Sequence, residues 1–243
     1  MKFKALIKKI LENIDGVMFD KGLTCNLCGR EVFHREDFCK DCLDTIDFND
    51  GPICSCCGRK TPIATKRCDS CKGEWAVDLA RSAFTYRGGA EGLIKALKYG
   101  GKQYLAEVLA PYLKQVYVEN YFAPDFITFV PMTDEATQKR GFNQAYLLAR
   151  ELAKITDNRC IEALLKKKET TQQEQLSAKE RQINLEKCFA VANKEEVFGK
   201  LVLLVDDVLT TGATAHACAK ALKEAGAKSV YLLTVASVVK RIG

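Results

Sequence analysis

Residues 201–237, LVLLVDDVLTTGATAHACAKALKEAGAKSVYLLTVAS, decide the fold class. Residues 201–205 form a continuous apolar run, which is typical of a strand buried in a parallel sheet. An acidic pair and a turn of small residues follow, and a helix is predicted from about residue 214 to 225, ending at a glycine. Residues 229–235 are the next predicted strand. This order predicts an α/β domain with a mostly parallel sheet flanked by helices.

The turn after the acidic pair is suited to binding an anion. It consists of Thr210, Thr211, Gly212, Ala213 and Thr214. A helix that begins here presents unpaired backbone N–H groups and the positive end of its dipole, which favours a phosphate monoester. Gly212 lets the backbone approach the phosphate closely. The carboxylates of Asp206 and Asp207 accept hydrogen bonds, so vicinal sugar hydroxyls are their expected partners.

This string resembles the signature of the type I phosphoribosyltransferases, which bind phosphoribosyl pyrophosphate with Mg²⁺ on its pyrophosphate. The resemblance implies that Asp206 and Asp207, the expected catalytic pair, hold the ribose 2- and 3-hydroxyls. It implies that residues 210–214 hold the 5-phosphate. Such a site lies beyond the carboxyl end of a strand, where ligands of open α/β sheets bind.

Eight cysteines form a duplicated module at residues 24–74, arranged as four Cys-x-x-Cys pairs that repeat with an offset of 29 residues. The predicted metal ligands are Cys25, Cys28, Cys39 and Cys42 in the first repeat and Cys54, Cys57, Cys68 and Cys71 in the second. In each repeat Gly-Arg follows the first pair, as Gly29–Arg30 and Gly58–Arg59. Four thiolates close a tetrahedral shell and leave no open position, which predicts two structural zinc sites rather than catalytic ones.

Two alternatives remain open for this module. Soft thiolates also bind iron–sulfur clusters. The ligands could be cross-braced between the repeats, although two consecutive sites, one per repeat, are the favoured arrangement. The module carries eight Lys and Arg against nine Asp and Glu, and a zinc held by four thiolates adds negative charge. This balance favours protein contact or scaffolding over binding of a phosphate backbone.

Three further segments resemble the ComF group (ComFC), the competence-associated phosphoribosyltransferase-like proteins. They are Leu-Lys-Tyr at 97–99, Lys-Arg-Gly-Phe-Asn-Gln at 139–144, and a polar segment from Thr170 to Phe189. A double zinc ribbon before the transferase domain fits the same group. The resemblance implies a role in natural transformation, in which the protein handles incoming single-stranded DNA in the cytoplasm. It also implies a DNA-import helicase and single-strand-binding recombination mediators as partners.

A second buried strand is predicted at residues 126–130. In phosphoribosyltransferases the loop after this kind of strand meets the pyrophosphate, so Pro131, Met132 and Arg140 are predicted substrate-binding residues. The alternative for Arg140 is a surface cation before a helix at 144–155. Relatives carry basic residues after the proline, whereas this chain has Asp134 and Glu135. Two acids near pyrophosphate have the wrong sign, which favours lost or altered catalysis.

The sequence predicts an amphipathic helix at residues 1–23, a double zinc ribbon at 24–74 and a phosphoribosyltransferase-like domain at 75–243. The helix is expected to dock on the body of the protein; the alternative is adhesion to a membrane surface. With 243 residues, 47% of them apolar, the chain can bury a real core. Its net charge of +6 is too small to argue for nucleic-acid binding by itself. No membrane span and no secretory signal are expected, which predicts a cytoplasmic protein.

Two functions fit these observations. In the enzymatic one, an amine or base attacks C1 of the ribose and pyrophosphate leaves, while a loop at residues 166–189 closes over the site. In the alternative, the same fold is a non-catalytic module that binds single-stranded DNA and proteins. Tyrosines and lysines that alternate at residues 86–104 are the candidate DNA contact; the alternative is an ordinary amphipathic helix at 90–109, which would show the same pattern.

Overall fold

The computed structural model describes residues 23–32, 36–167 and 185–239. It divides into two compact units, residues 1–45 and 46–243. The first contains one short helix in its described part, α2 (Lys40–Leu43). The second contains the other cysteine repeat together with the sheet. The predicted helix at residues 1–23 lies outside the described residues apart from Leu23.

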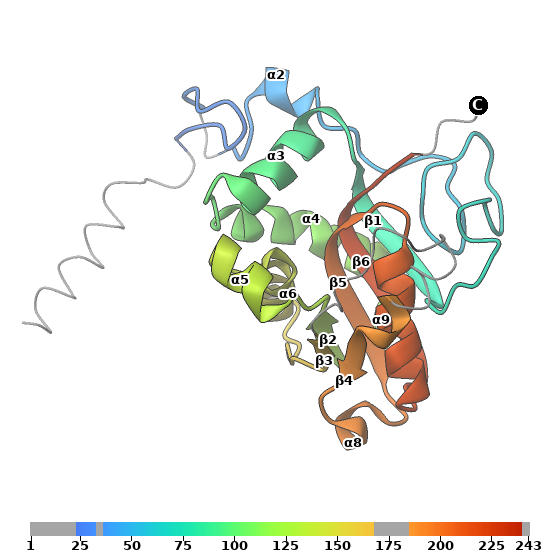
Figure 1. Cartoon of the computed structure of the whole chain (residues 1–243). Coiled ribbons are helices and arrows are strands. Elements are labelled where there is room, and N and C mark those ends of the chain that lie inside the picture. The colour runs from blue at the N-terminus through green and yellow to red at the C-terminus, as the bar shows by residue number, and fades with distance from the viewer. Residues whose placement is uncertain (1–22, 33–35, 168–184, 240–243) are drawn as a thin grey trace, which may run out of the picture. The chain divides into compact units, whose positions relative to one another are not determined.

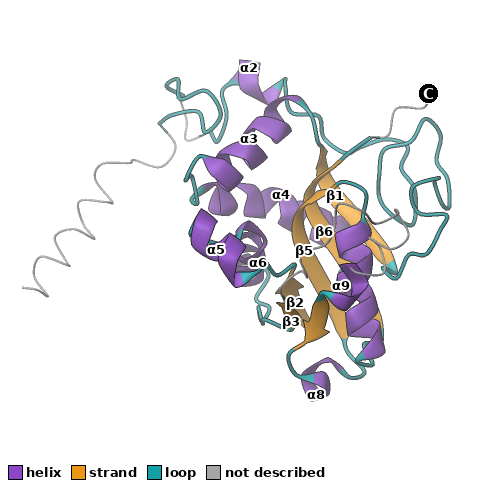
Figure 2. Ribbon diagram, in the orientation of Figure 1, coloured by secondary structure: helices purple, strands orange, loops and turns teal. Residues whose placement is uncertain are grey.

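The second unit is built around a parallel sheet of four strands. The strands lie in the order β1-β6-β5-β2 (Figures 1 and 2). The strands are β1 (Leu79–Thr85), β2 (Phe126–Phe129), β5 (Leu201–Leu209) and β6 (Ser229–Ser237). The two central strands, β5 and β6, are almost entirely buried. The fold class predicted from the sequence is confirmed.

Helices cover both faces of this sheet. The described helices of this unit are α3 (Gly88–Tyr99), α4 (Leu105–Glu119), α5 (Asp134–Arg140), α6 (Gln144–Ile155), α8 (Lys194–Val197) and α9 (Ala213–Glu224). In Figure 2, α4 and α6 pack on one face of the sheet and α9 on the other. A pair of short antiparallel strands, β3 (Leu164–Lys166) and β4 (Phe189–Val191), brackets the segment predicted as a closing loop. Residues 168–184 of that segment lie outside the described residues.

The ends of several elements differ from the sequence prediction. The strand predicted at 201–205 continues to Leu209, because Val208 and Leu209 are buried and still pair with β6. The acidic pair therefore lies inside the strand. The single helix predicted at 90–109 is wrong: Gly100 and Gly101 end α3, and α4 begins at Leu105. The helix at 144–155 is confirmed, with Asn143 as its N-cap.

Candidate functional site

Each cysteine repeat brings its own four sulfur atoms together, so the pairing is sequential, as favoured. The sulfur–sulfur distances are 3.8 Å for Cys28–Cys39, 3.5 Å for Cys54–Cys71, 3.4 Å for Cys57–Cys68 and 3.9 Å for Cys68–Cys71. A tetrahedral zinc with bonds of about 2.3 Å sets its sulfurs about 3.8 Å apart. The spacing and the donor chemistry therefore fit two structural zinc ions.

An open cavity lies at the carboxyl end of β5. It is lined by Asp206, Val208, Leu209, Thr210, Gly212, Thr214, Ala215, Leu232 and Thr234. The cavity thus joins one of the two predicted acids to three residues of the predicted phosphate loop. Helix α9 begins directly at this loop, and the first amide groups of a helix have no carbonyl partner within it. An anion in the cavity would meet these amides.

Gly212 is required at its position for two reasons. It is the N-cap of α9 with φ of 91°, a left-handed conformation that side chains rarely adopt. A Cβ atom there would also lie 2.5 Å from the ring of Trp75. The tight turn predicted at this glycine is therefore present, and an aromatic ring packs against its outer side.

The structure separates the two acids of the pair, because successive side chains of a strand point to opposite faces. Asp206 lines the cavity. Asp207 is buried and forms an ion pair with Lys98 of α3, with 2.9 Å between Nζ and Oδ1. Burial and the charge of Asp207 raise the pKa of Asp206 to about 8. Ionising Asp206 in the folded protein is therefore costly.

Asp206→Asn is expected to raise the melting temperature at pH 8, and the gain should shrink as the pH falls toward 4. The folded pKa of Asp206, about 8, lies above its ordinary value of 3.8, so the folded wild type loses stability as the pH rises through this window. Asparagine carries no charge and avoids this loss. Thermal unfolding at several pH values measures the difference, with the exposed Asp134→Asn as control. A gain that does not vary with pH would contradict the assignment.

The residues predicted to meet pyrophosphate gather after β2. Pro131 is buried, and the guanidinium of Arg140 lies 3.6 Å from the Met132 sulfur and 5.3 Å from the centre of the Tyr99 ring. The two acids that depart from the family pattern have a local explanation. Asp134 and Glu135 are exposed in the first turn of α5, where carboxylates stabilise the positive end of a helix.

Sequence reasoning missed three residues beside the site. Lys98 was noted only as part of a motif and a candidate DNA contact, yet it pairs with Asp207. Arg59 donates a hydrogen bond of 2.6 Å from Nη2 to the carbonyl oxygen of Thr210, and Trp75 packs against Gly212. A signal existed only for Arg59, because the Gly-Arg pair recurs in both cysteine repeats.

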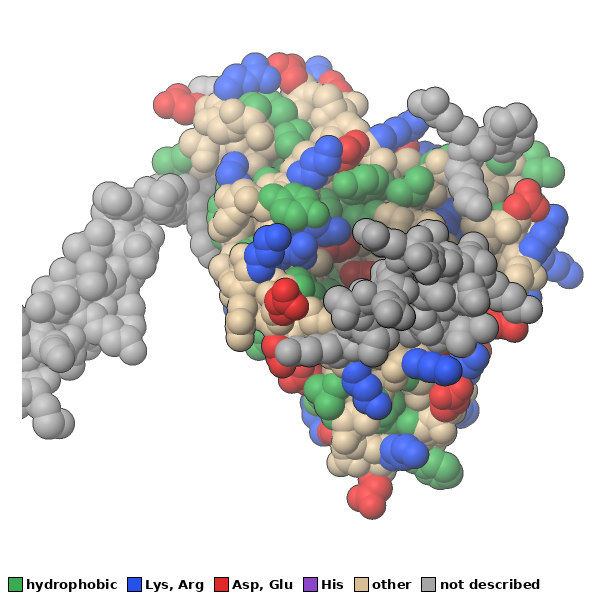
Figure 3. Space-filling view, viewed as in Figure 1, with side chains coloured by type: hydrophobic (Ala, Val, Ile, Leu, Met, Phe, Trp, Pro, Cys, Tyr) green, Lys and Arg blue, Asp and Glu red, His purple; other side chains and the backbone are tan. Residues whose placement is uncertain are grey.

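On the side drawn in Figure 3, the visible Lys and Arg side chains of the described residues lie among Asp and Glu side chains. Within the described ranges, no helix combines the length and apolar character needed to cross a bilayer.

Comparisons with known protein families match two regions of the chain. A model of the double zinc ribbon domain matches residues 21–72, and a model of the phosphoribosyl transferase domain matches residues 136–241. Among solved structures, a glutamine phosphoribosylpyrophosphate amidotransferase from B. subtilis, complexed with ADP and GMP, is 20% identical. This likeness has a TM-score of 0.43 and covers 58% of this chain and 30% of that chain.

The curated relatives include competence proteins and proteins named DNA utilization protein YhgH; the YhgH of Salmonella typhimurium is 29% identical over 86% of this chain and 87% of its own length. Competence protein ComFC of Streptococcus pneumoniae is 30% identical over 79% of this chain and 84% of its own length. Competence protein F of Haemophilus influenzae is 37% identical over 45% of this chain, and ComFC of Bacillus subtilis is 28% identical over 64%. This chain spans 48% and 62% of those two proteins, respectively.

Proposed function

Because the chain belongs to the ComF family of competence proteins, we propose that it binds phosphoribosyl pyrophosphate and serves the handling of imported single-stranded DNA. One observation carries the binding proposal. A carboxylate, a glycine turn and a helix N-terminus line the same cavity at the carboxyl end of β5. The glycine turn and the helix N-terminus are complementary to the phosphate of a phosphoribosyl group, and the carboxylate is complementary to its sugar hydroxyls.

Each residue has a definite task in this proposal. Thr210 and Thr214 donate hydroxyl hydrogen bonds to the 5-phosphate beside the first amides of α9. Asp206 accepts from a ribose hydroxyl, and Asp207 holds Lys98 next to the sugar. Arg140 supplies positive charge on the side where pyrophosphate would lie. Mg²⁺ on the pyrophosphate would neutralise part of its charge, which matters beside Asp134 and Glu135.

The second candidate function is a non-catalytic module that binds single-stranded DNA and protein partners in the cytoplasm. The acids after Pro131 favour it, since they leave the pyrophosphate side with less positive charge than the family pattern provides. Both functions retain the phosphate loop. They differ in whether a nucleophile attacks C1 of the ribose after binding.

Calorimetric titration of the zinc-loaded protein with phosphoribosyl pyrophosphate, with and without Mg²⁺, tests the proposal. We expect micromolar binding that depends on Mg²⁺. A screen of amines and bases for pyrophosphate release would then decide between transfer and binding alone. Absence of binding by a folded, zinc-loaded protein would contradict the proposal. Single-stranded DNA and a helicase would then be the ligands to test.

A further inference from the structure

The second cysteine repeat is joined to the phosphate loop by three contacts. Arg59 donates from Nη2 to the Thr210 carbonyl oxygen at 2.6 Å. The Trp75 ring packs against Gly212, so closely that no Cβ would fit. The amide of Ala76, the next residue, donates to Nδ1 of His216, one turn into α9, at 3.1 Å. We call this set of contacts the ribbon–loop contact.

Arg59 is an unusual residue to find in such a contact. Its side chain belongs to a residue only 2% exposed, and its Nε and Nη1 atoms make no hydrogen bond with any described residue. A buried charge is costly unless an opposite charge lies close to it. Cys57, two positions earlier, is near enough for an electrostatic interaction. A zinc held by four thiolates carries about two negative charges, so the metal-loaded cluster supplies the missing counter-charge.

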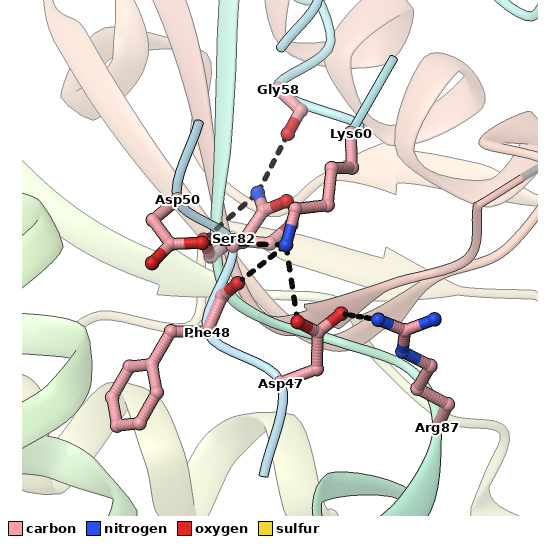
Figure 4. Close-up of polar contacts among 8 residues, drawn as sticks. Asp47, Phe48, Asp50, Gly58, Lys60, Ser82 and Arg87 are labelled. Atoms are coloured by element: carbon pink, nitrogen blue, oxygen red, sulfur yellow. Dashed lines mark hydrogen bonds and ion pairs between the residues drawn. The ribbon is translucent and has the colours of Figure 1, made fainter. Parts of the chain in front are cut away.

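The residues on both sides of Arg59 are held by hydrogen bonds to the segment 47–50 (Figure 4). Asn49 donates from Nδ2 to the Gly58 carbonyl oxygen at 2.7 Å and to that of Ser82 in β1 at 3.2 Å. Lys60 bonds to Asp47 and Asp50 and to the carbonyl oxygen of Phe48, at distances between 3.0 and 3.3 Å. These hydrogen bonds fix the backbone at Arg59. Its side chain can therefore restrict the conformation of the phosphate loop that it contacts.

The first repeat provides an internal comparison. Arg30, the equivalent of Arg59, turns back to its own repeat, with Nε 3.4 Å from the Cys28 sulfur and Nη2 2.7 Å from Asp41. Gly29 has no described neighbour within 4 Å of an added Cβ, whereas at Gly58 an added Cβ would collide with the carbonyl oxygen of Ala80. The two arginines have the same place in the repeat but different partners.

We propose that Arg59 is a positioning residue through which the metal-loaded second cysteine cluster fixes the shape of the phosphate-binding loop. The inference rests on the proposed function in one respect, namely that the loop receives the 5-phosphate. The cluster acts on the ligand only through the loop. Its effect should therefore fall on ligands that carry the 5-phosphate and spare pyrophosphate.

The test compares Arg59→Ala with the matched variant Arg30→Ala in the full-length, zinc-loaded protein. Calorimetry gives the Kd for ribose 5-phosphate and, separately, for pyrophosphate, and metal analysis gives the zinc content. Trp75 is the chain's one tryptophan, so its fluorescence reports on the ribbon–loop contact directly. Arg59→Gln is included because it keeps a donor for the Thr210 carbonyl if Arg59→Ala does not fold.

We expect Arg59→Ala to weaken ribose 5-phosphate binding by about 10- to 100-fold and to shift the Trp75 emission to longer wavelength. Arg59→Gln should retain part of the affinity. Arg30→Ala should change neither the ribose 5-phosphate affinity nor the Trp75 emission. Pyrophosphate binding should be the same in all variants, and every variant should keep two zinc ions per chain. Unchanged affinity and emission in Arg59→Ala would overturn the proposal, as would loss of zinc from it. If the wild-type protein does not bind ribose 5-phosphate, the proposed function is wrong. The Trp75 emission of Arg59→Ala, compared with that of the wild type, still tests whether Arg59 maintains the ribbon–loop contact.

Discussion

Replacing Asp206 and Asp207 together by asparagine is expected to weaken the binding of phosphoribosyl pyrophosphate by at least about 100-fold. A hydrogen bond contributes about 0.5–1.5 kcal/mol and one to a charged group about 1.5–3 kcal/mol. The double variant removes the acceptor that Asp206 offers the ribose and the charged partner of Lys98. Asp206 lies in the cavity, so its direct contact with a ribose hydroxyl is lost. Asp207 acts through Lys98, whose side chain is only 20% exposed and would lose its partner. Calorimetric titration with Mg²⁺ present measures the change.

The single variants should separate these two effects. Asp206→Asn should lower affinity while leaving the fold intact, since it removes a buried charge next to another one. Asp207→Asn should also lower the melting temperature, because an ammonium group that is mostly buried without a counter-charge is costly. Melting curves recorded beside the titrations distinguish the two. Equal losses of stability in both would contradict the division of roles.

A matched control is available in the same domain. Asp134→Asn combined with Glu135→Gln also replaces two adjacent carboxyl groups by amides, but at exposed positions in the first turn of α5. Its affinity should be unchanged or higher, since it removes repulsion from the pyrophosphate side. Zinc content should stay at two per chain in both double variants. Unaltered affinity in the Asp206 and Asp207 variant would refute the assignment of the sugar hydroxyls.

The sequence predicted those parts of the fold whose signals are local. The apolar run that begins β5, the cap of α6 at Asn143 and the Cys-x-x-Cys spacing each depend on residues a few positions apart. The helix predicted at residues 90–109 was wrong because a second local signal, a pair of glycines, was given too little weight. Two adjacent glycines, Gly100 and Gly101, outweighed an amphipathic pattern that would otherwise run through them.

The candidate site was predictable in type but not in detail. The loop and the acidic pair could be named, because their residue types match the chemistry of phosphate and sugar. The opposite directions of the two acids depend on β5 continuing past them, which only its pairing with β6 decides. The contact of Arg59 with Thr210 joins residues 151 positions apart, and no periodicity or spacing links them.

Removing a zinc ligand from the second cluster is expected to weaken ligand binding at the phosphate loop, whereas the same change in the first cluster should leave this binding intact. Cys71 and Cys42 form a matched pair, because they occupy equivalent places in the repeat and are both buried. Cys71→Ser should reduce the zinc content to one per chain, shift the Trp75 emission and weaken ribose 5-phosphate binding by at least about 10-fold. Cys42→Ser should lose one zinc and nothing else.

The physical reason lies in how each cluster is built into the protein. The first belongs to a compact unit of its own, residues 1–45, while the second belongs to the unit that contains the sheet. Around the second cluster, the amide of Ala80 in β1 donates to the Cys56 carbonyl oxygen at 2.9 Å, and Arg81 donates to that of Ser55 at 3.0 Å. A structural zinc contributes about 10–16 kcal/mol of apparent binding energy to its fold. Its loss here would loosen the support of the phosphate loop.

Three measurements on the same samples decide this prediction: zinc content, Trp75 emission and titration with ribose 5-phosphate. If Cys42→Ser and Cys71→Ser lower the affinity equally, the dependence on zinc is not specific to the cluster beside the loop, and the prediction is wrong. If neither lowers it, the loop holds its shape by the glycine turn and α9 alone. The prediction is confirmed if only Cys71→Ser loses affinity for ribose 5-phosphate and if Arg59→Ala shows the same Trp75 emission as Cys71→Ser. The zinc ion and Arg59 would then act on the loop through the same contacts.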